Sequence, residues 1–244
     1  MGMYAVCELL LVHPLVKQLN QLLTRIKIDL ILGSANKKTD LERTSFWSGD
    51  AVDHTRTIAT YEKTDKGYRA NFFKFRVCAQ EKILPYVTEG ANAKFSRAGN
   101  CQEHVGLGLY YLFQHSDLWS KIEVVTFDDC FDHVFLRITA KDKEVFYFDS
   151  WSEQIFTKAN KEHLDKITDV IMSGFDAMLE RAESSDEVEE LRDSIAQCTK
   201  IVQAGSPSIS KELSYTPQQA KQFIKQFDNY YQALLSPPNL SPKL

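Results

Sequence analysis

The sequence predicts an α+β protein, because stretches with helical periodicity flank a short central region with the pattern of β-strands. Near the start, apolar residues recur every three or four positions from Leu15 to Leu30. In the centre, residues 123–127, 132–140 and 144–150 are rich in β-branched and aromatic residues, which predicts three strands. After residue 158 the chain is predicted to be helical.

Length and composition favour one packed domain. The chain has 244 residues, of which 43% are hydrophobic, and we place the domain at residues 1–235. Residues 236–244 read as a flexible Ser/Pro tail or the start of a linker. The net charge of −4 gives no reason to expect nucleic acid as a partner. No apolar run approaches the ~20 residues that a membrane helix needs, so no membrane span is expected.

The five cysteines are an odd, widely scattered set, which is a poor disulfide framework and indicates a reducing compartment. Met1 to Val16 lacks the basic leading region and the cleavage site of a signal peptide, so the apolar start is read as part of a packed N-terminal helix. Cys7, Cys78 and Cys198 lie on apolar stripes and are expected to be core thiols.

The connections between these regions are less regular. Residues 33–67 are polar and rich in turn formers, which predicts a surface connection with short elements. Residues 72–87 predict a helix ending near Pro85, with a strand starting at Phe72 as the alternative. Residues 89–100 are small and polar and read as a loop.

Residues 101–115 predict a helix that contains two glycines, Gly106 and Gly108. Each glycine costs such a helix about 1 kcal/mol relative to alanine. A cost of this kind suggests a packing reason, most simply a sheet or a second backbone lying close against the helix.

Three helices are expected in the C-terminal part. The first covers residues 158–181, and the second covers 188–202 and ends at Gly205. Thr216, Pro217 and Gln219 supply the N-cap, the first-turn proline and the capping-box side chain of the third. The third helix has an apolar face of Phe223, Phe227, Tyr230 and Leu234. We expect these helices to pack on their own domain, with a partner-binding hairpin as the alternative.

Cys101 lies at the start of a predicted helix, a position that favours a nucleophilic cysteine. The small residues Ala98, Gly99 and Asn100 deliver it to the first turn of the predicted helix. Unpaired amides and the helix dipole at that position favour negative charge, which enriches the thiolate. The same amides can stabilise an oxyanion that develops on a substrate.

His133 and Asp149 are expected to act as partners of this cysteine. If Ala140 pairs with Glu144 across the tight turn, His133 and Asp149 lie on the same face of the hairpin as diagonal neighbours. Their backbones would then be roughly 7–8 Å apart. A register shift of one residue would place them on opposite faces. The carboxylate would fix the imidazole tautomer, and Trp151 would shield the pair from water.

Three motifs also resemble a known group of enzymes. Gly99–Glu103, Asp132-His133-Val134 and Phe148–Trp151 resemble the Cys-His-Asp core of papain-like and transglutaminase-like bacterial effector enzymes. The group contains glutamine deamidases, cross-linking transglutaminases and effector proteases. The resemblance covers residues 99–151 and implies a papain-like core, in which a nucleophile helix packs on an antiparallel sheet, with additional N- and C-terminal helices.

The sequence departs from the group at two positions. Ser150 stands where these enzymes often carry proline, and no glutamine precedes Cys101 to donate a side-chain hydrogen bond to an oxyanion. Asn100, Asn92 or backbone amides are the candidates for that role.

The resemblance implies a cysteine-dependent acyl transferase that acts on glutamine side chains of a host protein, by cross-linking or deamidation through a thioester. A papain-like cysteine protease is the alternative, because the thioester step is common to all three reactions. The protein would reside in the bacterial cytoplasm before secretion and in the host cytosol after delivery. A regulatory protein could bind the cleft or the C-terminal helices, and neither a cofactor nor a metal is expected.

A rival reading uses the same residues as metal ligands. Cys101-x-x-His104 and Cys130-x-x-His133 are matching pairs that could form a tetrahedral zinc site. In a regular strand Cys130 and His133 would point to opposite faces, which weakens this reading. Without zinc, Glu103 and His104 are expected to be exposed helix residues, with a place at the border of the substrate cleft as the alternative for either.

Two further interpretations assign no catalytic role. An inactive papain-like core could serve as an interaction module whose helices do the binding. The loop acids Asp128, Asp129 and Asp132 are expected to form a solvated turn, because a calcium loop needs a longer pattern of oxygen ligands. The remaining histidines have no recognisable partner in the sequence and receive no role: His13, His54, His115 and His163.

Overall fold

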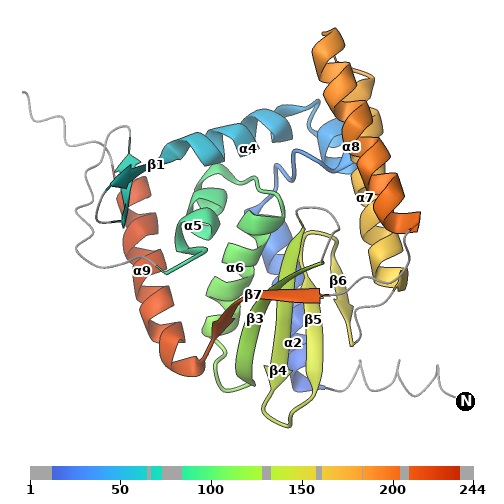
Figure 1. The fold of residues 1–244 in the computed structure, drawn as a ribbon. Coiled ribbons are helices and arrows are strands. Elements are labelled where there is room, and N and C mark those ends of the chain that lie inside the picture. The colour runs from blue at the N-terminus through green and yellow to red at the C-terminus, as the bar shows by residue number, and fades with distance from the viewer. Residues whose placement is uncertain are drawn as a thin grey trace, which may run out of the picture.

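The fold is α+β, as the sequence predicts. The computed structural model describes residues 13–64, 67–72, 84–127, 133–157, 161–182, 184–203 and 209–236. Within these ranges it contains eight helices, a two-stranded antiparallel sheet and a five-stranded antiparallel sheet (Figure 1).

The five-stranded sheet has the order β6-β5-β4-β3-β7. The three predicted central strands are present, and the first begins at Trp119 rather than at residue 123. Two further strands, β6 and β7, were not predicted, so the expectation that the chain is purely helical after residue 158 is wrong at β7. The strands are β3 (Trp119–Phe127), β4 (Val134–Ala140), β5 (Val145–Asp149), β6 (Gln154–Phe156) and β7 (Ile209–Tyr215).

Two adjacent helices place the nucleophile candidate beside this sheet: α6 (Cys101–Phe113) and α5 (Val87–Ser96). A Cβ atom on Gly106 would lie 2.5 Å from the backbone nitrogen of Gly90 on α5, and one on Gly108 would lie 3.2 Å from Leu136 of the sheet. Both glycines are therefore explained by close packing, as predicted. The prediction of a loop for residues 89–100 is wrong over α5. The sequence did not indicate this helix because its buried face consists mainly of small residues.

The N-terminal helix α2 (Pro14–Asp29) is confirmed, and its buried residues are Leu15, Val16, Leu19, Leu22 and Ile26. In the segment predicted as a turn-rich connection, the structure has α3 (Lys38–Arg43) and the longer α4 (Trp47–Ile58). Over the part of α4 whose burial is described, residues 47–56, the buried residues are Ser48, Val52 and Thr55, and two of them are polar. The apolar periodicity that marks a helix is therefore absent from its sequence.

A hairpin of β1 (Ala59–Thr64) and β2 (Gly67–Phe72) follows α4. Phe72 thus lies in a strand, although it ends that strand and does not start it. Most of the helix predicted for residues 72–87 lies outside the described residues, and Leu84 to Tyr86 are not helical.

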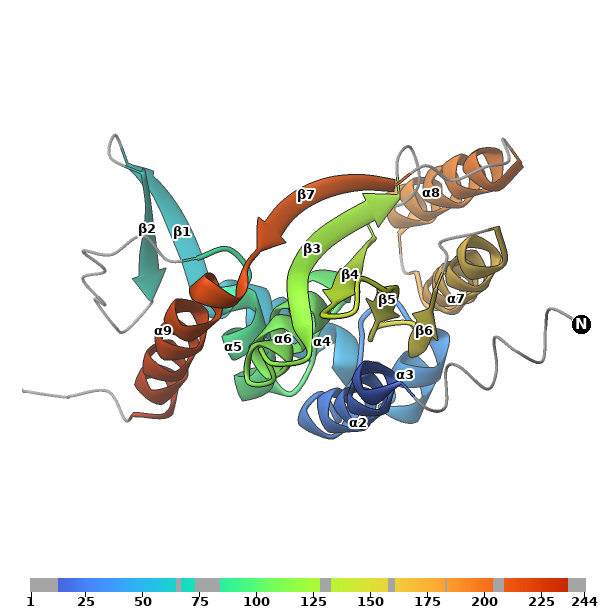
Figure 2. The same cartoon turned by 90° about the horizontal axis from the view of Figure 1, so that it is seen from below.

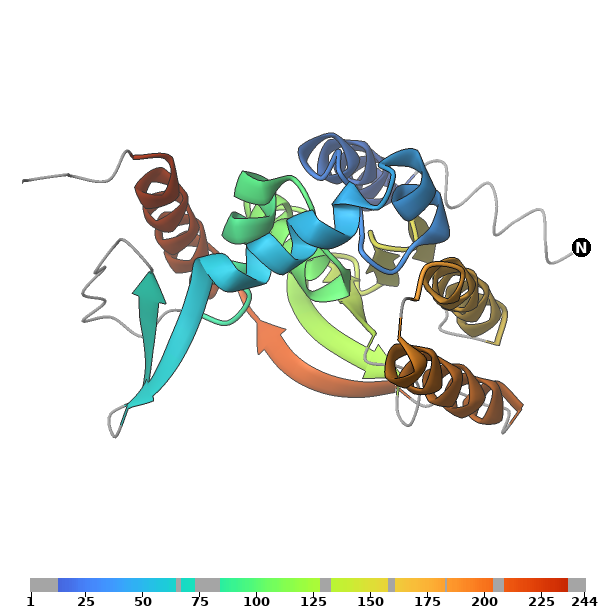
Figure 3. The ribbon, with the colours of Figure 1, turned by 90° about the horizontal axis from the view of Figure 1, so that it is seen from above.

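The C-terminal helices lie at two opposite ends of the molecule. The pair α7 (Lys161–Leu179) and α8 (Ser185–Gln203) extends from the β6 end of the sheet, whereas α9 (Pro217–Leu235) packs beside α5 at the other end (Figures 2 and 3). The predicted cap of α9 is confirmed, since the Thr216 amide donates to Gln219 Oε1 at 2.9 Å. Phe223, Phe227 and Tyr230 are buried, so α9 packs on its own domain as expected. Among the described residues, no helix is long and apolar enough to cross a membrane.

Candidate functional site

Cys101 is the first residue of α6, and two neighbouring segments fix the start of that helix. The Asn100 amide donates to Glu103 Oε2 at 3.0 Å, and Arg56 Nε donates to Glu103 Oε1 at 3.2 Å. Asn100 Oδ1 in turn accepts from the Ala35 amide at 3.0 Å. The expectation that Glu103 is exposed is wrong, because its carboxylate is buried as the partner of the helix cap and of Arg56.

The side chains proposed for an oxyanion hole have other partners. Asn92 Oδ1 accepts from the Tyr230 hydroxyl at 3.1 Å, so Asn92 ties α5 to α9. The side-chain oxygen Oδ1 of Asn100 accepts from the Ala35 amide, which leaves the side-chain nitrogen Nδ2 as the group that could donate to an oxyanion. Backbone amides at the start of α6 remain the further candidates.

His133 and Asp149 meet, because the hairpin has the predicted register. The Ala140 amide donates to the Glu144 carbonyl at 2.8 Å, and β4 and β5 pair in that same register. His133 Nε2 lies 2.8 Å from Asp149 Oδ2. At the start of β4 the His133 carbonyl also accepts from Thr126 Oγ1 at 3.1 Å, which anchors the histidine backbone to β3.

Burial and charge make this contact an ion pair. Burial by itself would lower the pKa of His133, but the Asp149 carboxylate and a hydrogen bond with the Cys101 thiol outweigh burial and raise that pKa. Burial would likewise raise the pKa of Asp149, whereas His133 and then His163 hold it well below its usual range. Since Nε2 faces Asp149, Nδ1 is the nitrogen of His133 that can exchange a proton with the thiol.

Cys101 is the least buried of the three residues. Cys101 is 8% exposed, whereas His133 and Asp149 are 2% and 1% exposed.

Trp151 lies beside the imidazole, in the shielding position that the sequence analysis expects. Its ring centroid is 5.0 Å from that of His133, and the residue is 1% exposed. The loop after α2 holds it, because Trp151 Nε1 donates to Asn36 Oδ1 at 3.2 Å and Lys37 Nζ donates to the Trp151 carbonyl at 2.9 Å.

His163 is a member of the site that the sequence analysis missed. It lies on α7, and its Nε2 is 3.4 Å from the same Asp149 Oδ2 that His133 contacts. The other oxygen of Asp149 accepts from the Ser152 amide at 3.1 Å. No local sequence pattern indicates a role for His163, because its contact with Asp149 forms only when α7 packs against the sheet.

His104 is buried, so the expectation that it is an exposed helix residue is wrong. Burial, reinforced by nearby Lys37, lowers the pKa of His104 to about 3, so the imidazole is neutral. A cavity of about 400 Å³ adjoins it, lined also by Arg43, Ser150 and Glu153 among others. Of the four residues of the alternative zinc site, Cys130 lies outside the described residues, as do the loop acids Asp128, Asp129 and Asp132.

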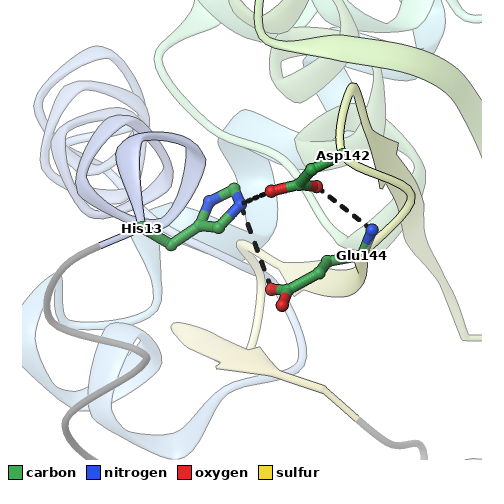
Figure 4. A group of neighbouring side chains, drawn as sticks. All are labelled: His13, Asp142 and Glu144. Carbon is green, nitrogen blue, oxygen red and sulfur yellow. Dashed lines mark hydrogen bonds and ion pairs between the residues drawn. The ribbon is translucent and has the colours of Figure 1, made fainter.

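A second polar group joins the start of α2 to the turn between β4 and β5 (Figure 4). His13 Nε2 lies 2.9 Å from Asp142 Oδ2 and 4.0 Å from Glu144 Oε2. Among the described residues this is the one group of three potential metal ligands whose ligand atoms all lie within 4.8 Å of one another. His13 Nδ1, however, accepts from the Leu15 amide at 3.1 Å, so in the neutral ring the proton is on Nε2. A metal needs the lone pair of Nε2, and the group therefore fits a structural contact better than a metal site.

Asp149→Asn is expected to lower the free energy of unfolding by about 2 kcal/mol, with a defined pH dependence. A carboxyl with a depressed pKa stabilises the fold above its ordinary pKa of about 4, and this stabilisation is lost as the pH falls. A histidine with a raised pKa contributes fully below about pH 6.5 and loses its contribution as the pH rises.

The stability difference between wild type and Asp149→Asn should therefore be largest between about pH 4 and pH 6.5 and shrink on both sides. Urea unfolding at a series of pH values measures it, with Asp117→Asn at an exposed position as the control. A difference that does not change with pH would mean that the two side chains do not form an ion pair.

Comparison of the chain with protein-family models, curated proteins and solved structures finds no match. The function is therefore inferred from the geometry of the site and from the motifs that compose it.

Proposed function

We propose that this protein is a cysteine-dependent acyl transferase that acts on glutamine side chains of a protein substrate. Cys101 would be the nucleophile, His133 the general acid and base, and Asp149 the residue that orients and charges the imidazole. The observation that carries the proposal is the buried contact of 2.8 Å between His133 and Asp149, with the imidazole also bonded to a thiol at the start of a helix.

The chemistry follows from the charges of these groups. The Cys101 sulfur attacks the carbonyl carbon of a substrate carboxamide, and amides at the start of α6 donate to the developing oxyanion. His133 Nδ1 gives its proton to the departing nitrogen, so ammonia leaves and a thioester remains. A lysine amine or water then attacks the thioester while His133 takes up a proton, which gives cross-linking or deamidation.

The resemblance of residues 99–151 to papain-like effector enzymes supports glutamine as the acyl donor. By the same resemblance the fold around the site is a papain-like core, and the substrate is a host protein met in the host cytosol after secretion. The aromatic rings of Phe135 and Trp151 lie beside His133, which is compatible with this chemistry because exclusion of water strengthens the electrostatic contacts in the site.

Intact-mass analysis tests the proposal. Wild type and Cys101→Ala are first incubated with a glutamine-mimicking, thiol-reactive probe, and each protein is then incubated with host-cell lysate. We expect labelling at Cys101 only. A lysate protein should gain about one dalton if the reaction is deamidation, or shift to a covalent conjugate if it is cross-linking.

Two results would contradict the proposal. Cleaved lysate proteins that depend on Cys101 would assign the same thioester chemistry to a protease. An unlabelled Cys101 together with zinc bound at an equimolar amount would replace the enzyme by a metal site.

A further inference from the structure

A second histidine contacts the acid of the candidate triad. His163 Nε2 lies 3.4 Å from Asp149 Oδ2, and His133 Nε2 lies 2.8 Å from the same oxygen. One carboxylate oxygen is thus shared by two imidazoles, while the Ser152 amide donates to the other oxygen. Asp149 is therefore restrained from three directions.

His163 lies 3.4 Å from Asp149 without competing for the charge of that carboxylate. The residue is 2% exposed, and burial lowers its pKa, which keeps the ring neutral. The charged or titratable groups that act on it are Asp149 of β5, His133 at the start of β4 and Lys166 on its own helix. A neutral N–H donor leaves the full negative charge of the carboxylate available to His133.

Aromatic rings fix the orientation of His163. Its ring centroid lies 3.5 Å from that of Phe156 on β6 and 5.4 Å from that of Phe135 on β4. The Phe135 ring in turn stacks on His133 at 5.9 Å. The side chain is therefore held between the helix that carries it and the sheet that carries the ion pair.

The helix α7 is itself docked next to the residues that support Trp151. A Cβ atom on Gly174 of α7 would overlap the backbone oxygen of Asn36. Asn36 accepts from the indole nitrogen of Trp151, and Trp151 packs on His133. Helix α7 is thus connected to the ion pair by two sets of contacts, one through His163 and one through Asn36 and Trp151.

We propose that His163 is a positioning residue for Asp149, so that α7 completes the site by restraining the acid that orients the catalytic imidazole. This inference rests on the proposed function, because it assigns to His163 a role in activating the Cys101 thiol. The observation behind it is that a buried side chain from a separate helix shares the oxygen atom that binds His133.

The test compares two substitutions of His163 that separate hydrogen bonding from packing. His163→Gln keeps an N–H donor and loses the ring, whereas His163→Phe keeps a ring for Phe156 and Phe135 and loses the donor. The measured quantity is the rate constant for alkylation of Cys101 by iodoacetamide at neutral pH, followed by peptide mass because the chain has five cysteines. His115→Ala, which changes a histidine in the turn after α6, is the control.

A positioning role predicts that His163→Phe reacts about tenfold more slowly than wild type and that His163→Gln reacts within about threefold of it. A merely structural role predicts the reverse order, since the phenylalanine preserves the packing. If His163→Phe fails to fold, as judged by its thermal transition, His163→Leu replaces it as the variant without a donor.

Equal rates for wild type and both variants, or a slower glutamine variant, would overturn the inference and leave the proposed function intact. A wild-type Cys101 that reacts no faster than the same thiol in the urea-unfolded chain would instead overturn the proposed function, and the inference with it.

Discussion

Replacement of His133 by glutamine is expected to lower the rate of acyl transfer by at least about 10³-fold while the protein remains folded. The imidazole of His133 is in hydrogen-bond contact with both Asp149 and the Cys101 thiol. Glutamine can still donate to Asp149, but it cannot take up or release a proton. The loss therefore falls on the chemical step and not on the burial of Asp149.

The reactivity of the thiol should change in the same direction. With His133 present, the raised pKa of the imidazole keeps a cation beside the sulfur through the neutral range, which stabilises the thiolate. In His133→Gln this cation is absent, so the rate of alkylation of Cys101 at neutral pH should fall strongly.

The measurement is the rate of iodoacetamide alkylation of Cys101 at neutral pH together with turnover of a glutamine-containing peptide. His115→Gln, away from the ion pair, should behave as wild type in both assays. Retention of more than a tenth of the wild-type turnover in His133→Gln would mean that another group transfers the proton, and the assignment of His133 would be wrong.

The position of His133 relative to Asp149 could be predicted from the sequence because it depends on local geometry. A tight turn at residues 141–143 leaves few registers for the hairpin, and the alternation of side chains then decides which residues share a face. The helix start at Cys101 is also local, since a small flexible run is followed by helical periodicity.

The parts that could not be predicted depend on tertiary packing. The buried face of α5 includes Gly90, Ala91 and Ala93, which give no apolar stripe because the neighbouring α6 backbone fills the space. The strand β7 is an edge strand with exposed polar residues, and its pairing with β3 shows no clear alternation in the sequence. Periodicity detects a helix or strand only when its buried side chains are large and apolar.

The contact of His163 with Asp149 belongs to the same class. The two residues are separated by β6 and by the start of α7, and no motif links them. A single sequence predicts partners within a hairpin or a helix turn, but it does not predict which face of a later helix will dock on a given sheet.

Gly106→Ala is expected to destabilise the fold by about 3 kcal/mol, which corresponds to a fall of about 6–12 °C in the thermal midpoint. A Cβ atom at this position would lie 2.5 Å from the backbone nitrogen of Gly90 and 2.6 Å from the carbonyl oxygen of Tyr86. Backbone atoms within a packed helix pair cannot move aside as a side chain can. The helices α5 and α6 would have to separate, and the start of α6, which carries Cys101, would shift with them.

Gly108→Ala is the matched control, because it lies on the same helix two residues away. The nearest atoms to its added Cβ are side-chain atoms of Leu136 at 3.2 Å and of Phe148 at 3.4 Å, which can give way by a few tenths of an ångström. Alanine also favours the helix over glycine by about 1 kcal/mol, so this variant should stay within about 1 kcal/mol of wild type. Thermal and urea unfolding of the two variants measure the difference. If both variants were equally stable, glycine at position 106 would not be needed for the close approach of α5 and α6. The placement of α5 against the nucleophile helix would then be wrong.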